Sequence, residues 1–303
     1  MISAIPTRQA QITSADGRRL AYAEFGDREG RPVILFHGNP GSRLICPDVA
    51  VTIAAEVRLI TFDRPGFGGS DPHPFHRLID VADDFAQLAS LLDVRRCSVI
   101  GWSAGGPYAL AAAARHRDLV ESAAVVSSAG LQDDPGVAAR HTDHTRALMT
   151  RLRGRLPDAV SAVEDRFASY AEDPAVIVKM TVANEADPDR RLMRLPEVAA
   201  ALSEMWREGA RQGTRGVTDG WIALWALHPG FDPVDVTQPV AVWHGTGDVI
   251  VDVGEGARLA EALPDSHLHL LPGEGHLIAL EHWAEILGST QRQPPGSRLT
   301  AGG

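Results

Sequence analysis

The sequence predicts an α/β fold, with a mostly parallel, doubly wound sheet that is interrupted by an inserted helical segment. Three observations lead to this prediction. Short apolar runs alternate with helical patterns over the first 130 residues, which is typical of parallel strands covered by helices on both faces. The stretch from 131 to 231 is helical in character and carries no clear strand, and strand signals then return.

Short apolar runs are expected to form the strands of the sheet. They lie at residues 11–14, 20–24, 33–36, 58–62, 97–100, 123–127, 240–243 and 268–271. The first two flank Asp16-Gly17, which is a hairpin signal. Helices are expected at 45–57, 80–92, 106–114 and 281–287, and the second of these carries apolar residues at helical spacing.

The break in this rhythm divides the chain into parts. Residues 1–130 and 232–288 are expected to form the α/β core, and residues 131–231 a helical cap. The tail 289–303, which contains Pro294-Pro295-Gly296, is expected to be disordered.

Composition narrows the class of protein. The chain has 303 residues, a formal net charge of -10 and a pI of about 5.6, which argues against a nucleic-acid partner. Two cysteines, Cys46 and Cys97, with no C-x-x-C pattern do not make a disulfide framework. No signal-peptide pattern and no apolar run long enough for a membrane span are visible. We therefore expect a cytoplasmic protein.

The sequence Gly101-Trp102-Ser103-Ala104-Gly105 fits the G-x-S-x-G pattern of a nucleophile elbow. This pattern places a serine hydroxyl on a strained turn between a strand and a helix. An apolar run precedes it and an alanine-rich helical run follows it, so the local context agrees. Ser103 is therefore a candidate nucleophile, although a serine in an ordinary helix-start turn would give the same five letters.

A serine hydroxyl needs a base, which is usually a histidine oriented by a carboxylate. Two late strands each run into a glycine-rich turn with a suitable residue, and these turns contain Asp248 and His276. Carboxyl ends of parallel strands meet at one edge of a sheet, where ligands bind. Other aspartates remain possible acids, namely Asp252, Asp133 and Asp134.

From about residue 12 to 287 the chain resembles the α/β-hydrolase superfamily, in its serine-nucleophile branch with a helical cap. The resemblance rests on five motifs, namely His37-Gly38-Asn39-Pro40-Gly41, Asp63-Arg64-Pro65-Gly66-Phe67-Gly68-Gly69-Ser70, the elbow, Gly245-Thr246-Gly247-Asp248 and Gly275-His276. The chain order of serine, acid and histidine is that of the superfamily. The resemblance implies Ser103 as nucleophile, His276 as general base and Asp248 as the orienting acid.

The resemblance also implies an oxyanion hole. Its donors would be the backbone N–H of Ala104, after the nucleophile, and of Asn39, since Pro40 has no N–H. Candidate pocket residues are Trp102, beside the nucleophile, and Trp221 and Trp225, which share a helix face in the cap. Packing within the cap would explain the last two equally well. No metal-ligand motif and no cofactor-binding motif is present, so we expect a cofactor-free, metal-free enzyme.

The function expected from these residues is hydrolysis of a small carboxylic ester, with an apolar acyl group, through an acyl-enzyme. Proline-iminopeptidase-like activity, C–C bond hydrolysis and perhydrolysis use the same triad and remain alternatives. Haloalkane dehalogenation and epoxide hydrolysis need a carboxylate nucleophile, and position 103 is serine. A non-catalytic ligand-binding protein on the hydrolase fold is the alternative from another class.

Overall fold

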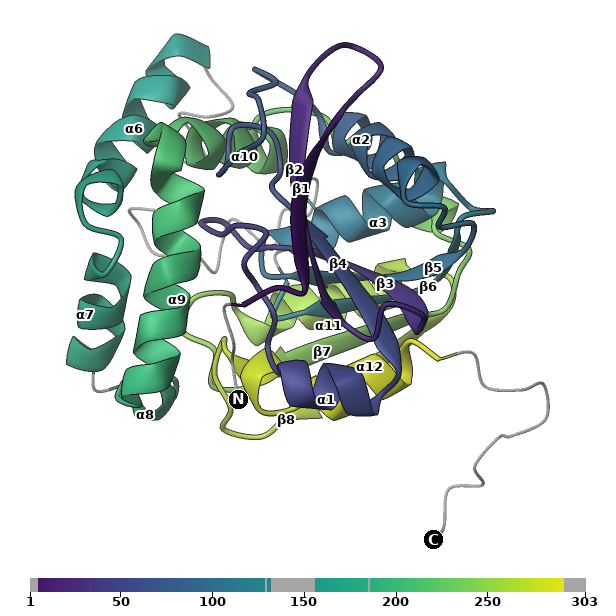
Figure 1. Cartoon of the computed structure of the whole chain (residues 1–303). Helices are drawn as coiled ribbons and strands as arrows, with labels where there is room; N and C mark the ends of the chain where they lie inside the picture. Colours follow the sequence, from purple (N-terminus) through teal and green to yellow (C-terminus); the bar gives the residue numbers. More distant parts are fainter. Residues whose placement is uncertain (1–4, 129, 132–155, 185, 292–303) are drawn as a thin grey trace, which may run out of the picture.

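The computed structural model describes residues 5–128, 130–131, 156–184 and 186–291. Its centre is an eight-stranded sheet with the strand order β1-β2-β4-β3-β5-β6-β7-β8 (Figure 1). The strands are β1 (Arg8–Thr13), β2 (Arg19–Gly26), β3 (Arg31–Phe36), β4 (Val57–Phe62), β5 (Cys97–Trp102), β6 (Val120–Val126), β7 (Val240–Gly245) and β8 (Ser266–Leu271). Only the pairings of β2 with β1 and with β4 are antiparallel, so the mostly parallel sheet predicted from the sequence is confirmed.

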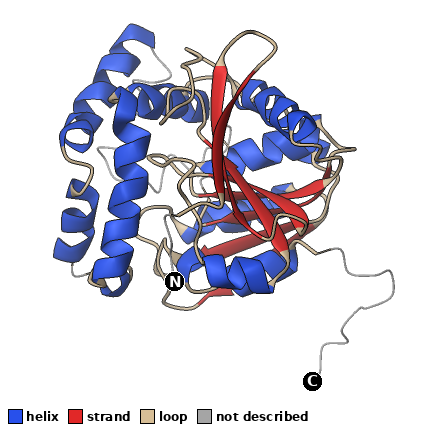
Figure 2. Cartoon of the chain, in the orientation of Figure 1, coloured by secondary structure: helices blue, strands red, loops and turns tan. Residues whose placement is uncertain are grey.

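Helices cover both faces of the sheet (Figure 2). Those of the α/β layers are α1 (Val49–Ala54), α2 (Leu78–Leu91), α3 (Gly105–Arg115), α11 (Val253–Ala262) and α12 (Trp283–Ser289). Helix α1 packs against α12, and α2 packs against α3 on the other side of the sheet (Figure 1). The apolar strands between these layers form the core, with residues such as Ile34, Ile60 and Val99 fully buried.

A group of helices lies between β6 and β7 in the chain and stands beside the sheet, in teal and green in Figure 1. It contains α6 (Leu156–Glu172), α7 (Val176–Ala183), α8 (Arg190–Met193), α9 (Pro196–Gly209) and α10 (Arg215–Trp225). Short 3-10 turns lie at Ala210–Gln212 between α9 and α10, at Pro233–Asp235 before β7, and at Ile278–Leu280 after β8. The expected boundaries of the cap remain a prediction, and its residues 132–155 and 185 lie outside the described part.

The structure differs from the expectation at two places near the C-terminus. Helix α11 was not expected; Asp252 caps it by accepting a hydrogen bond from the Gly254 N–H at 2.9 Å. Thr290, expected in the tail, is buried, and its hydroxyl accepts a hydrogen bond from Arg31 at 3.0 Å. Residues 292–303 lie outside the described part, so the expectation for the rest of the tail stays a prediction.

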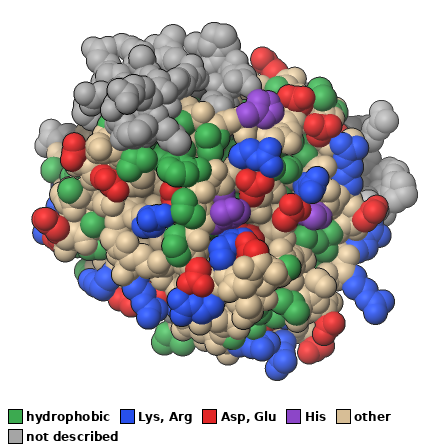
Figure 3. Space-filling view, turned by 90° about the horizontal axis from the view of Figure 1, so that it is seen from above, with side chains coloured by type: hydrophobic (Ala, Val, Ile, Leu, Met, Phe, Trp, Pro, Cys, Tyr) green, Lys and Arg blue, Asp and Glu red, His purple; other side chains and the backbone are tan. Residues whose placement is uncertain are grey.

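The surface carries charges of both signs. Seen from above, acidic and basic side chains are interspersed on the visible face (Figure 3). Among the helices of the described residues, none has the length and apolar character needed to cross a bilayer.

Helix α3 approaches the sheet unusually closely because glycines line the contact. A Cβ atom on Gly101 would come within 2.5 Å of Gly106 Cα, and a Cβ on Gly105 would overlap the carbonyl oxygen of Phe36. This close approach places the start of α3, and the turn before it, at the carboxyl ends of β3 and β5.

We predict that Gly105→Ala lowers the free energy of unfolding by about 1–3 kcal/mol, because the added methyl group overpacks this contact. Gly288→Ala in α12 is the matched control, since a Cβ there meets nothing within 4 Å. Removing a helical glycine at such a site stabilises by about 0.4–1 kcal/mol. Urea unfolding of both variants tests this, and equal midpoints would contradict the close packing.

Candidate active site

The turn after β5 holds Ser103 in a strained conformation. Its φ of 56° is in the left-handed region, which a non-glycine residue rarely adopts. The Ser103 N–H donates to the Val126 carbonyl at 2.8 Å, and the Gly106 N–H donates to the Ser103 carbonyl at 3.0 Å. The strand-to-helix turn expected of a nucleophile elbow is therefore present, and the serine side chain is only partly buried.

His276 and Asp248 meet at the ends of neighbouring strands. His276 Nδ1 lies 2.7 Å from Asp248 Oδ2, although the two residues are 28 apart in sequence. The Asp248 side chain is fully buried, and its Oδ1 accepts the N–H groups of Ile250 and Val251 at 2.8 and 2.9 Å. Because Nδ1–H donates to the carboxylate, Nε2 of a neutral imidazole is left as the basic nitrogen.

The electrostatics of this pair favour a charged imidazole. Burial opposes the charged form, but the charge of Asp248 and its hydrogen bond outweigh burial, so the pKa of His276 is raised above its ordinary value. For Asp248, burial alone would raise the pKa. The charge of His276 and the hydrogen bonds to the carboxylate outweigh burial, so the pKa of Asp248 lies well below its usual range. Asp248 is therefore ionised at neutral pH.

The other candidates for the acid are placed differently. Asp252 caps α11, so its carboxylate is used for a helix start. Asp133 and Asp134 lie outside the described residues. His244 is buried beside Asp248, with Nε2 3.4 Å from Asp248 Oδ2 and 3.0 Å from the Val251 carbonyl, so it braces the turn that carries Asp248.

A cavity of about 160 Å³ joins Ser103 and His276. The described residues that line it are Gly38, Asn39, Pro40, Ile45, Trp102, Ser103, Ile177, Leu202, Met205, Trp206, Ile250, His276 and Leu277. Most of them are apolar, and His276 is the only titratable side chain among these described residues. No hydrogen bond joins Ser103 to His276 in the described part of the chain, while the Trp102 indole N–H donates to the His276 carbonyl at 3.2 Å.

The two residues expected to supply an oxyanion hole, Asn39 and Ala104, follow Gly38 and Ser103 in the chain. A Cβ on Gly38 would lie 3.2 Å from Ser103 Cβ, so the loop after β3 passes directly over the serine. Between described residues, neither the Asn39 nor the Ala104 N–H donates a hydrogen bond. Asn39 lines the cavity, whereas Ala104 is not among its described lining residues, so their expected part in an oxyanion hole stays a prediction. Ala104 also stands at the N-cap of α3, where the helix dipole favours negative charge.

The Gly38–Asn39 peptide is fixed by hydrogen bonds to its carbonyl oxygen. Its carbonyl oxygen, on Gly38, accepts hydrogen bonds from Arg64 Nη2 and from His37 Nδ1, both at 2.8 Å. His37 Nε2 in turn accepts the Arg64 N–H at 3.2 Å, which requires the neutral imidazole. Burial and the Arg64 charge hold the pKa of His37 well below its ordinary value, consistent with that form.

Comparisons with known proteins agree with this architecture. A family model described as the alpha/beta hydrolase fold matches residues 31–282. The chain belongs to this family.

Relatives within the alpha/beta hydrolase family carry several activities. A pimeloyl-(acyl-carrier protein) methyl ester esterase of Chromobacterium violaceum is 27% identical over 256 residues, which cover 84% of this chain and 90% of that protein. A non-heme chloroperoxidase of Streptomyces lividans is 26% identical over 279 residues, covering 89% and 94%. The structure of a thermophilic esterase from Thermogutta terrifontis matches with a TM-score of 0.65 and 24% identity, covering 93% and 96%. The chain is accordingly an esterase-like hydrolase of this family.

Not every expected pocket residue of this hydrolase lines the cavity. Trp102 does, but Trp221 and Trp225 are not among the described lining residues. Trp221 packs instead against Phe167 and Trp225, with ring centroids 5.8 and 6.3 Å apart. Their contact with substrate stays a prediction. In the described part of the chain, no group of three or more His, Cys, Asp or Glu residues is arranged to hold a metal ion.

Within the cap, the sequence singles out Trp221 and Trp225, whereas the helix that contributes most to the cavity wall is α9. Leu202, Met205 and Trp206 all come from α9 and are spaced three and four apart, so they share one face. That spacing is visible in the sequence, but it marks any buried helix face. Only the packing of α9 shows that this face is turned to the nucleophile.

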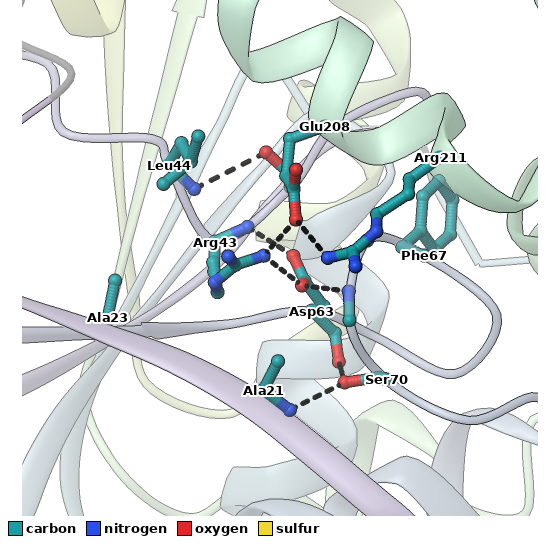
Figure 4. A network of polar contacts seen from close by, with 12 residues as sticks. Ala21, Ala23, Arg43, Leu44, Asp63, Phe67, Ser70, Glu208 and Arg211 are labelled. Atoms are coloured by element: carbon teal, nitrogen blue, oxygen red, sulfur yellow. Dashed lines mark hydrogen bonds and ion pairs between the residues drawn. The ribbon is translucent and has the colours of Figure 1, made fainter. Parts of the chain in front are cut away.

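A polar network fixes α9 to the core beneath it (Figure 4). Arg43 Nη1 bridges Glu208 Oε1 of α9, at 2.5 Å, and Asp63 Oδ2 of the core, at 2.7 Å. Asp63 is fully buried and also accepts the N–H groups of Arg43 and Gly69 at 2.6 and 2.8 Å. Arg43 therefore links the helix of the cavity wall to a buried carboxylate of the core.

We predict that Arg43→Met lowers the free energy of unfolding by about 3–5 kcal/mol, because it leaves the buried Asp63 without its cation. Burial raises the pKa of Asp63 to about 6 in spite of Arg43, so the measurement belongs at about pH 8, where this carboxylate is ionised. Arg211→Met is the matched control, because Arg211 is exposed and lies 3.6 Å from Glu208. We expect it to change stability by about 0–1 kcal/mol. Similar losses in both variants would contradict the role of Arg43.

Proposed function

We propose that the protein hydrolyses carboxylic esters through an acyl-enzyme, with Ser103 as nucleophile, His276 as general base and Asp248 as the orienting acid. The observation that carries this proposal is the 2.7 Å contact of His276 with Asp248 at the wall of a cavity that Ser103 also lines. No cofactor takes part in the proposed reaction.

In the acylation step, Ser103 Oγ attacks the ester carbonyl carbon and passes its proton to His276 Nε2. Asp248 keeps the proton on Nδ1 and stabilises the imidazolium that forms. The oxyanion accepts hydrogen bonds from the Asn39 and Ala104 N–H groups. The tetrahedral intermediate then collapses, the C–O bond to the alcohol breaks, and His276 gives its proton to the leaving alkoxide.

In the deacylation step, water takes the place of the alcohol. His276 Nε2 removes a proton from the water as it attacks the acyl carbon, and the same two N–H groups stabilise the second tetrahedral intermediate. Collapse breaks the bond to Ser103 Oγ, which receives the proton back from His276. The products are a carboxylic acid, an alcohol and the free enzyme.

The walls of the cavity favour an uncharged, apolar acyl group. Leu202, Met205, Ile177 and Ile250 line it, with no Lys or Arg side chain among the described lining residues. An acyl group that carried its own carboxylate would lose its water without gaining a partner there. The esterase among the relatives supports ester cleavage as the chemistry, and a small-molecule ester is the partner that we propose.

We predict that Ser103→Ala lowers kcat for p-nitrophenyl acyl esters by about 10⁴-fold or more, since the nucleophile is lost. Release of p-nitrophenol measures this, and circular dichroism verifies the fold of the variant. Ser90→Ala is the matched control, because Ser90 is exposed on α2, and we expect it to keep wild-type rates. Turnover retained in Ser103→Ala would refute the proposed nucleophile.

We also predict an acid limb in the pH profile of kcat/KM with its inflection above 6.5, the ordinary pKa of histidine. His276 must be neutral to accept a proton, so activity falls as pH drops through its raised pKa. Asp248→Asn removes the charge that raises this pKa, so the inflection should move to lower pH while kcat falls by about 10⁴-fold. An unchanged inflection in that variant would show that another group controls the limb.

A serine-directed fluorophosphonate separates this proposal from a non-catalytic binding role. Labelling of the wild type that disappears in both Ser103→Ala and His276→Ala supports an activated serine. A wild type that is folded but not labelled would favour the binding role.

A further inference from the structure

We infer that Asp189 is a positioning residue for this site: its carboxylate, from the helical segment between β6 and β7, fixes the backbone of the loop that carries His276. This inference rests on the proposed function, because it assigns His276 the part of the base. Asp189 touches neither the cavity nor the reacting atoms, and it acts only through His276.

The contact is made by both carboxylate oxygens. Asp189 Oδ2 accepts the His276 N–H at 2.6 Å, and Oδ1 accepts the Leu277 N–H at 3.1 Å. The Asp189 residue is 4% exposed, so these bonds form away from water. Charge-assisted hydrogen bonds of this kind are about twice as strong as neutral ones. The two bonds grip consecutive peptide units and so fix the backbone on which the imidazole is mounted.

The Asp189 side chain does not cap its own helix, which is the usual role of an aspartate at this position. Asp189 occupies the N-cap position of α8, where an aspartate side chain usually caps the helix, but it makes no capping bond there. Its own N–H donates to Asp187 Oδ1 at 2.9 Å, which orients the short segment before α8. The carboxylate is thus turned away from its own helix and toward the His276 loop.

The loops that carry Asp248 and His276 have glycines where they contact the segment before α8. A Cβ on Gly275 would overlap the Asp189 carboxylate, so a larger residue before His276 would displace this carboxylate. A Cβ on Gly247 would lie 3.0 Å from the Pro188 side chain, so the loop of Asp248 is in contact with the same segment. Gly247 and Gly275 belong to two of the motifs on which the family resemblance rests, and the sequence alone did not explain why these positions are glycine. The structure gives a reason, which is that Pro188 and Asp189 approach these two positions closely.

The charge of Asp189 also acts on the imidazole. Among the described residues, the charged groups with the largest effects on His276 are Asp248 after β7, and Asp189 and Asp187 before α8. Burial lowers the pKa of His276, whereas these three carboxylates raise it. A negative charge at Asp189 therefore stabilises the imidazolium that forms during acyl transfer. The pKa of Asp189 itself is raised above its ordinary value, because burial outweighs the two N–H groups and the charge of His276, which lower it.

Exposed ion pairs beside the contact of Asp189 with the His276 loop provide a control for the mutation of Asp189. Arg191 of α8 reaches Glu274 Oε2 at 2.7 Å and Glu281 Oε1 at 2.6 Å, so it spans the His276 loop from the solvent side. Its side chain is 53% exposed, and exposed pairs contribute little. Arg191 and Asp189 thus join the same two segments, but only Asp189 holds the backbone of His276.

The test compares Asp189→Asn with Arg191→Met in the full chain. An asparagine at 189 keeps the shape and one accepting oxygen, but its NH₂ group faces a backbone N–H and its charge is gone. We expect kcat for p-nitrophenyl esters to fall by about 10- to 100-fold with KM within about threefold, since small misplacement of a catalytic group has effects of this size. The acid limb of kcat/KM should move to lower pH. Arg191→Met should keep kcat within about twofold, with its acid limb unmoved or slightly higher.

A readout that needs no turnover separates this inference from the proposed function. Histidine ring signals in NMR give the pKa of His276 directly, and the His276→Gln variant identifies its signal. A lower pKa in Asp189→Asn than in the wild type supports the inference even if no ester is cleaved, in which case only the proposed function fails. If Asp189→Asn is folded and retains the wild-type kcat and His276 pKa, the inference is overturned. Equal effects of both variants on kcat, with no change in the His276 pKa, would also overturn it.

Discussion

The hydrogen bond between His276 and the buried carboxylate of Asp248 is the interaction on which the rest of the site depends. The two residues follow the neighbouring parallel strands β7 and β8, so the sheet itself brings them together. A buried carboxylate is tolerated only when its oxygens are satisfied, and here two backbone N–H groups and the imidazole do this. The same bond fixes the tautomer of His276, and with it the nitrogen that can accept a proton.

The other half of the site depends on backbone approaching backbone. Ser103 has a positive φ at the end of β5, and the loop of Gly38 passes directly over it. Both arrangements need glycines at the contact between α3 and the sheet. Behind this loop, Arg64 and His37 hold the Gly38 carbonyl, so the N–H of the same peptide points the opposite way. The surroundings of Ser103 are thus formed by closely packed backbone and fixed peptide dipoles rather than by mobile side chains.

The helices between β6 and β7 do more than cover the sheet. Helix α9 forms much of the cavity wall, and Arg43 ties it to the buried Asp63 of the core. The segment before α8 lies against the loops of both His276 and Asp248. In the proposed reaction, the selection of an acyl group and the orientation of the base therefore depend on one structural feature, which is how this helical group packs on the core.

The sequence by itself determined the α/β class, the positions of most strands along the chain and the candidates Ser103, Asp248 and His276, because strand runs and glycine-rich turns are local patterns. It did not reveal α11, whose two glycines, Gly254 and Gly256, weaken the helical signal. Only the tertiary structure decided that α9 faces the cavity, that Trp221 packs with Phe167, and that Asp189 grips the His276 loop. These contacts join segments far apart in the chain, and an apolar helix face or a helix-start aspartate has the same local pattern whichever partner it meets.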